Sequence, residues 1–248
     1  SRGLGDVYKR QSMNKYLFES DFSADSLRWH QTREQNAGKM SVEELQKLQA
    51  EILSTKDSAL AYFFAAEFGY QTWKMQQIIL DNKDAKYAFL FAQNIRNCDI
   101  KALQKLVTDS KKTKYICKFA CFVKGADRKP LESIILNSKN VKYAHMFLKH
   151  VKGSDVTKFK GLIMDSGKPR YLFELAKHTK KLDEISKIED LIIAAGSFTY
   201  MRLFAEKIKL ANIEKLEQAV LDSDNIIEIK KFAKYVKRSK MKRFFLVL

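Results

Sequence analysis

The chain has 248 residues, of which 46% are hydrophobic, and it carries a formal net charge of +17. Two prolines and nine glycines are too few for the many turns of a long β-rich or loop-rich fold, so the composition predicts an all-helical protein. The sequence contains no uninterrupted apolar run of the roughly 18 residues that a membrane-spanning helix needs.

The basic balance suggests an anionic partner such as nucleic acid or a membrane surface. Lysine greatly outnumbers arginine in the sequence, however. Specific recognition of bases and phosphates relies on the planar, bidentate guanidinium of arginine. The charge therefore favours non-specific attraction over sequence readout.

Residues 1–11, "SRGLGDVYKRQ", have neither a helical period nor the apolar stretch of a secretion signal. They resemble the translation of a transposon-based sequencing adaptor, so no fold or function is inferred from them. Residues 12–41 lack most periodicity, and we interpret them as a linker or an irregular segment. We expect the natural sequence to begin at Ser12 or Met13 and to be part of a longer repeat protein.

The main signal is an internal repeat of 28 residues. Four consecutive copies begin at Thr72, Ile100, Arg128 and Val156. A fifth copy, 184–212, has one extra residue, a sixth covers 213–240, and a degenerate copy covers about 44–71. In each copy, apolar residues at helical spacing predict two short helices, each with one apolar stripe.

Polar residues at the predicted turns are typical of helix caps. The predicted first helices are preceded by the N-cap candidates Asp99, Asp127, Asp155 and Asn212, with Asp183 beside the extra residue. The same capping role is predicted, before the second helices, for Asp81-Asn82, Asp109-Ser110, Asn137-Ser138, Asp165-Ser166 and Asp222-Ser223. Gly125 and Gly153 are placed to adopt the left-handed conformation after second helices, and Pro130 and Pro169 to stand in first turns.

Helices of roughly 10 residues are not stable alone in water, so neighbouring repeats must bury their apolar stripes. The sequence therefore predicts an all-α solenoid over residues 42–248, with about seven stacked two-helix repeats in two layers. The pattern resembles the α-hairpin repeat class that includes HEAT, armadillo and tetratricopeptide proteins, with a shorter period than those families use. The resemblance implies a binding scaffold and carries over no catalytic residue.

Two columns of basic residues recur at equivalent repeat positions and are the candidate sites for an anion or a partner. The first column, just before a tyrosine, is Lys86, Lys114, Lys142 and Arg170. The second, near the end of the second helices, is Arg96, Lys124, Lys152, Lys180, Lys209 and Lys237. A cation near a helix C-terminus complements the helix dipole, which explains the second column without a ligand, whereas the first lies near helix N-termini and is the better functional candidate.

A column of aromatic residues follows the first basic column. Its members are Tyr87, Tyr115, Tyr143, Tyr171 and Tyr200. Regularly spaced aromatics beside lysines are typical of the stacking platforms of single-strand binders. Most of these tyrosines lie four residues before a phenylalanine of the core stripe, however, which favours packing between repeats with the hydroxyl outward.

The sequence offers little for catalysis. Cys98, Cys117 and Cys121 fit no disulfide framework and no zinc-ligand spacing, so we expect free thiols in a reducing compartment and a cytoplasmic location. The four histidines share no repeat position, and no nucleophile elbow, phosphate loop or H-E-x-x-H motif is present. We therefore expect no metal and no cofactor.

These observations lead to one expectation and two alternatives. We expect a non-enzymatic scaffold that mediates protein–protein interaction along one face. The first alternative is binding of RNA or DNA through the stacked basic columns. The second is an enzyme built on the repeat scaffold.

Overall fold

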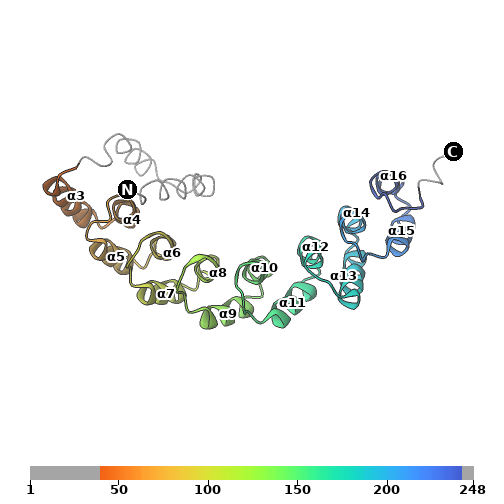
Figure 1. The fold of residues 1–248 in the computed structure, drawn as a ribbon, viewed down its shortest axis with the longest axis horizontal. Helices are drawn as coiled ribbons and strands as arrows, with labels where there is room; N and C mark the ends of the chain where they lie inside the picture. Colours follow the sequence, from red (N-terminus) through yellow and green to blue (C-terminus); the bar gives the residue numbers. More distant parts are fainter. Residues whose placement is uncertain (1–39, 242–248) are drawn as a thin grey trace. The chain divides into compact units, whose positions relative to one another are not determined.

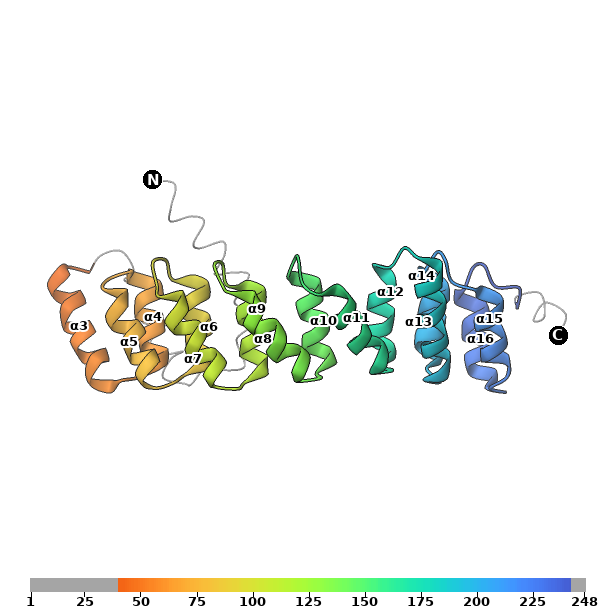
Figure 2. The same ribbon diagram turned by 90° about the horizontal axis from the view of Figure 1, so that it is seen from below.

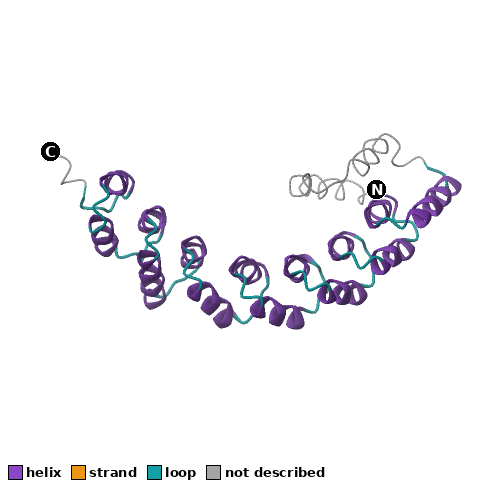
Figure 3. Cartoon of the chain, turned by 180° about the vertical axis from the view of Figure 1, so that it is seen from behind, coloured by secondary structure: helices purple, strands orange, loops and turns teal. Residues whose placement is uncertain are grey.

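The computed structural model describes residues 40–241, and in that range every regular element is an α-helix (Figure 1, Figure 3). This confirms the predicted all-α solenoid. The interpretations of residues 1–11 and 12–39 lie outside the described residues. The chain divides into two compact units. The first ends at Lys111, and the second begins at Lys112.

The first unit contains five described helices. They are α3 (Val42–Thr55), α4 (Ser58–Phe68), α5 (Thr72–Asp81), α6 (Ala85–Asn94) and α7 (Ile100–Asp109). Each helix packs against the next, and α4 also contacts α6 while α5 contacts α3 and α7. Helices of the unit therefore alternate between two layers (Figure 1).

The second unit continues the same pattern. Its helices are α8 (Thr113–Phe122), α9 (Arg128–Asn137), α10 (Val141–His150), α11 (Val156–Asp165), α12 (Pro169–Lys177), α13 (Leu182–Ala194), α14 (Phe198–Lys207), α15 (Ile213–Leu221) and α16 (Ile226–Tyr235). The second helices α8, α10, α12, α14 and α16 contact one another in order. Successive helices of the unit lie side by side (Figure 2).

Buried phenylalanines recur at one position of the second helices, with Phe91 in the first unit and four others in the second. Equivalent positions on the second helices hold Phe91, Phe119, Phe147, Phe204 and Phe232, and all five side chains are fully buried. Leu175 takes this position on α12 and is also buried. The ring of Phe147 stacks on that of Phe159 at a centroid distance of 4.8 Å, which joins the layers of second and first helices.

The predicted caps of the first helices are confirmed. The carboxylates of Asp99, Asp127 and Asp155 accept hydrogen bonds from backbone N–H groups in the first turns of α7, α9 and α11. The Asn212 side chain does the same for α15. Asp183 does not cap, because α13 begins one residue earlier, at Leu182, and Asp183 lies inside its first turn.

The predicted caps of the second helices are wrong. Asn137 is the last residue of α9 and Ser138 is its C-cap, so the pair ends the first helix. The Ser138 hydroxyl donates to the Ile135 carbonyl at 2.7 Å and accepts from the Asn140 N–H at 3.3 Å. The side chain that caps α10 is that of Asn140, which accepts from the Lys142 N–H. The other four predicted pairs likewise end their first helices.

The turn inside each hairpin requires a left-handed residue. The residues in this conformation are Lys56, Lys83, Lys111, Lys139, Gly167, Gly196 and Asp224, with φ between 50° and 63°. Five of these positions therefore carry a side chain where glycine is favoured. Gly125 and Gly153 have positive φ after second helices, and Pro130 and Pro169 lie in first turns, as predicted.

A hydrogen bond that the sequence did not indicate fixes successive first helices to each other. A side-chain oxygen of Gln76, Glu132 or Glu189 accepts the backbone N–H of a residue 23 positions later, at 2.7 to 2.9 Å. The acceptor residue lies in a first helix, and the donor N–H belongs to the N-cap of the next one. Lys160 stands at the equivalent place before the extra residue, where its ammonium pairs with Glu184 at 2.7 Å.

Candidate binding surface

The first basic column lies at the second position of four second helices. Lys86 is in the first unit, on α6, and Lys114, Lys142 and Arg170 are in the second unit, on α8, α10 and α12. Three of these cations lie over the ring of the next tyrosine: Lys86 over Tyr87 at 5.1 Å, Lys114 over Tyr115 at 5.4 Å and Arg170 over Tyr171 at 5.9 Å. This attraction offsets part of the unfavourable interaction between each cation and the helix dipole. The column therefore has a structural role that the sequence did not indicate.

The second basic column lies just beyond the C-caps of the second helices. Arg96 follows the C-cap Ile95 in the first unit, and Lys124 follows Val123 in the second. The other members, Lys152, Lys180, Lys209 and Lys237, are exposed on the same turn of later hairpins. Within residues 40–241, Lys124, Lys152, Lys180, Lys209 and Lys237 form no ion pair with a carboxylate.

The tyrosine column packs between hairpins, as the sequence favoured. The Tyr87 ring lies 5.9 Å from that of Tyr62 in the first unit. In the second unit, Tyr171 lies 5.6 Å from His145 and Tyr200 lies 6.1 Å from Phe173. In each case the partner is on the preceding second helix. One side of each of these three rings is thus covered by the preceding hairpin, which reduces the ring surface open to stacking of nucleobases.

The cysteines are free thiols inside or beside the core. Cys117 is buried, its sulfur lies 4.0 Å from that of Cys121, and its thiol donates to the Tyr143 carbonyl at 3.4 Å. The hydrogen bond with Cys121 and burial both raise the pKa of Cys117. Cys117 is therefore a thiol at neutral pH and contributes to the packing of α8 on α10.

Two of the histidines lie half-buried or against an aromatic ring. Burial lowers the pKa of His145, which packs on Tyr171, and of His150, whose ring lies 5.0 Å from that of Phe122. Residues 40–241 contain no group of three or more His, Cys, Asp or Glu side chains placed to hold a metal ion. In the same range no helix is both long and apolar enough to cross a membrane.

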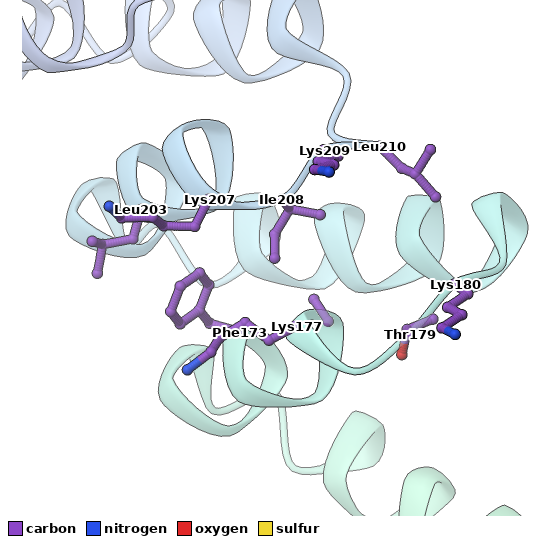
Figure 4. Close-up of a pocket in the computed structure, with 10 residues that line it drawn as sticks. Phe173, Lys177, Thr179, Lys180, Leu203, Lys207, Ile208, Lys209 and Leu210 are labelled. Carbon is purple, nitrogen blue, oxygen red and sulfur yellow. The ribbon is translucent and has the colours of Figure 1, made fainter.

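A groove in the second unit brings two members of the second column together. It has a volume of about 710 Å³ and lies between α12 and α14 (Figure 4). Its apolar lining consists of Phe173, Ala176, Leu203, Ile208 and Leu210. Its polar lining consists of Lys177, Thr179, Lys180, Lys207 and Lys209. No carboxylate belongs to either set.

The four lysines differ in how far they are already paired. The Lys177 ammonium lies 3.0 Å from the Glu174 carboxylate and 5.6 Å from the centre of the Phe173 ring. Lys180, Lys207 and Lys209 form no ion pair within the described part of the chain. Sequence reasoning selected Lys180 and Lys209 but missed Lys177 and Lys207. Lys207 stands where other repeats carry Asn94, Phe122, His150, His178 and Tyr235. Lys177 stands one position earlier, where lysine recurs only at Lys149 and Lys234, so no continuous column marks either residue.

The wall formed by the segment after α14 is held in place by an arginine. The Arg238 guanidinium donates to the carbonyls of Ala205 at 2.7 Å, Ile208 at 2.9 Å and Lys209 at 3.1 Å. Three hydrogen bonds from one planar group fix the path of the chain through Ile208 and Lys209. These hydrogen bonds therefore hold one wall of the groove in place.

The helices and this surface define the chain as a helical-repeat protein of the α-solenoid kind. Comparison with family models, with curated proteins and with solved structures found no match. The class therefore follows from the fold itself, from its tandem hairpins and their recurring caps and junctions.

Proposed function

We propose that the chain is a non-enzymatic helical-repeat scaffold that binds a protein partner. The observation that carries the proposal is the groove between α12 and α14, which is open and largely apolar on a frame of tandem hairpins. Its volume of about 710 Å³ is in the range of sites that bury a drug-sized ligand or a short peptide. The likeness of the repeats to HEAT, armadillo and tetratricopeptide hairpins supports the same role.

The geometry of the groove favours a protein ligand over other macromolecules. Its apolar lining is aliphatic apart from Phe173, and Phe173 itself is buried. Peptide side chains enter apolar grooves of this kind, with a few polar groups fixing their orientation. Single-stranded nucleic acids are instead bound by exposed aromatic faces along a basic track.

Selection of peptides tests the proposal. A library of short random peptides displayed on phage is panned against the immobilised full chain, and enriched peptides are titrated by fluorescence anisotropy. We expect a consensus that binds with a micromolar Kd, since short peptides bury a limited area. Failure to enrich any consensus sequence, with the chain shown to be folded by circular dichroism, contradicts the proposal.

Nucleic-acid binding remains a second candidate, favoured by the exposed cations of the first column. In the second unit, Lys114, Lys142 and Arg170 lie on α8, α10 and α12, which contact one another in order. None of the ion pairs in the described part of the chain involves these three cations. Labelled single-stranded RNA and double-stranded DNA are titrated at several salt concentrations. A steep salt slope that falls in the triple variant Lys114→Glu, Lys142→Glu, Arg170→Glu supports this candidate, and no binding at low salt rejects it.

A further inference from the structure

We propose that the groove between α12 and α14 binds an extended, acidic peptide segment of a partner protein, with apolar side chains in its middle and carboxylates toward both ends. The inference rests on the proposed function and adds to it the chemistry of the partner. It uses Lys177, Lys180, Lys207 and Lys209 together with the apolar floor.

The distribution of charge along the groove gives the pattern of the ligand. The amines of Lys177 and Lys207 lie at the end marked by Phe173 and Leu203, and Lys180 and Lys209 lie at the end marked by Thr179 and Leu210 (Figure 4). Apolar side chains lie between the two pairs. A ligand complementary to this surface has anionic groups at two separated places and apolar groups between them.

The helix C-termini beside the groove do not repel such a ligand strongly. Last-turn carbonyls carry partial negative charge when they lack donors. On α14 the Ala205 carbonyl accepts from Arg238. On α12 the Leu175 carbonyl accepts from the Thr179 hydroxyl at 2.9 Å and the Ala176 carbonyl from the Thr179 N–H at 3.1 Å. With these carbonyls paired and Lys177 balanced by Glu174, the lysines without an ion pair in residues 40–241, Lys180, Lys207 and Lys209, set the sign of the local potential.

The same arrangement argues against a lipid. A single-chain amphiphile carries its charge at one end, so only one pair of lysines would meet a headgroup while the other faced the acyl chain. A peptide presents a side chain toward the same face at every second residue of an extended strand. It can therefore place leucines on the floor and aspartates at both ends.

The rigid wall makes binding less costly in entropy. The segment Ile208–Lys209 is held by Arg238 before any ligand arrives, and Ile208 is already buried. Binding then orders chiefly the lysine side chains and the peptide. The Lys177–Glu174 ion pair keeps one ammonium beside the floor in the free protein.

The probe is a fluorescein-labelled peptide with leucine and phenylalanine at its centre and two aspartates at each end. Its binding to the full chain is measured by anisotropy. Three comparison peptides replace the aspartates with lysines, replace the apolar centre with serines, or keep aspartates at one end only. We expect the first two not to bind measurably and the third to bind more weakly.

Matched variants locate the site. The test variant is Lys180→Glu, Lys209→Glu, and the control is Lys124→Glu, Lys152→Glu, which changes the net charge equally at the same repeat position but outside the groove. We expect about a tenfold loss of affinity in the test variant and less than about a threefold loss in the control. Leu210→Ser, which alters only the apolar lining, is expected to weaken binding with charge unchanged, and melting curves verify that each variant folds.

The outcomes separate this inference from the proposed function. Equal losses of affinity in the two double variants would mean that the peptide is attracted to the basic surface in general, and would overturn the proposed binding in the groove. No binding of the probe, while peptide display still yields a consensus, also overturns it but leaves the scaffold role in place. Absence of any peptide ligand in both experiments rejects the two together.

Discussion

The backbone N–H of Asp155 donates a hydrogen bond of 2.7 Å to Oε1 of Glu132, which lies 23 residues earlier in the chain. Asp155 is the N-cap of α11 and Glu132 lies in α9, so the bond joins successive first helices. The same N-cap residue accepts from the Lys158 N–H at 3.1 Å. One residue therefore both begins its own helix and attaches it to the hairpin before.

Substitution of Glu132 tests this junction. Glu132→Met keeps the length of the side chain but leaves the Asp155 N–H without its acceptor, so we expect a loss of about 1 kcal/mol in the free energy of unfolding. Glu132→Gln keeps an acceptor and is expected to change it by less than about 0.5 kcal/mol. Urea denaturation followed by circular dichroism measures both. Equal effects of the two substitutions would contradict the role of the hydrogen bond.

Glu189 makes the junction with Asn212, at 2.9 Å, from a buried position. Burial raises the pKa of its carboxyl above the ordinary value of 4.5. The folded protein then holds the proton more tightly than the unfolded chain, so stability falls as pH rises from 4.5 through the raised pKa. We expect Glu189→Gln to be more stable than the parent near neutral pH, with an advantage that shrinks as pH falls toward 4.5.

Thermal melting over a series of pH values checks this expectation. The chain provides a precedent, because Gln76 accepts the Asp99 N–H at 2.9 Å at the equivalent junction. Gln76→Glu is the reciprocal variant and is expected to introduce the same pH dependence at the first unit. A parallel pH dependence of the Glu189→Gln variant and the parent would show that Glu189 is not its source.

Lys139 adopts φ of 50° in the turn between α9 and α10. The left-handed conformation costs a residue with a side chain about 1–2 kcal/mol, and glycine avoids this cost. Glycine also loses more backbone entropy on folding, which offsets about 0.5–1 kcal/mol of the gain. We therefore expect Lys139→Gly to raise the free energy of unfolding by up to about 1 kcal/mol. Gly167 and Gly196 already occupy the equivalent turns.

The control for this effect is Lys149→Gly, an exposed lysine inside α10. Glycine in a helix is expected to lower the free energy of unfolding by about 1 kcal/mol there. Opposite signs at the two lysines, measured by urea denaturation, verify the left-handed turn. Destabilisation at both positions would mean that the turn is not left-handed.

Phe147 is fully buried and stacks on Phe159 at 4.8 Å. Removing the ring leaves a cavity between the two layers, so Phe147→Ala is expected to cost about 3–5 kcal/mol. Phe147→Leu is expected to cost much less, since Leu175 fills the same position on α12. Calorimetry of both variants gives the difference, and similar losses would indicate a site that leucine cannot fill.

Local patterns in the sequence predicted the features that depend on neighbouring residues. The cap at Asp99 and the apolar stripe through Phe119 follow from side-chain chemistry within one helix turn. The Asn137-Ser138 pair was assigned to the wrong helix because short polar residues stabilise both the end of one helix and the start of another. A turn of only three residues separates the two possibilities, which the sequence alone does not resolve.

Features that depend on residues a full repeat apart were not predicted. The acceptor at the junction is glutamine at Gln76, glutamate at Glu132, and is replaced by Lys160 where an extra residue intervenes. Such variation hides the column from inspection of one sequence. The groove was not predicted for a related reason. Lys207 has no lysine counterpart in other repeats, Lys177 shares its position with Lys149 and Lys234 among other residue types, and only the packing of α12 on α14 brings the two lysines together.

The side-chain hydrogen bonds that join neighbouring hairpins span 23 to 33 residues of the chain. At the junctions of Gln76, Glu132 and Glu189, the acceptor lies in one hairpin and the donor N–H in the next. A gene for such a protein can gain or lose whole repeats by duplication or deletion without breaking a bond between distant parts. The Lys160–Glu184 ion pair shows how one such joint accommodates a single added residue, through a charged bridge in place of the usual hydrogen bond.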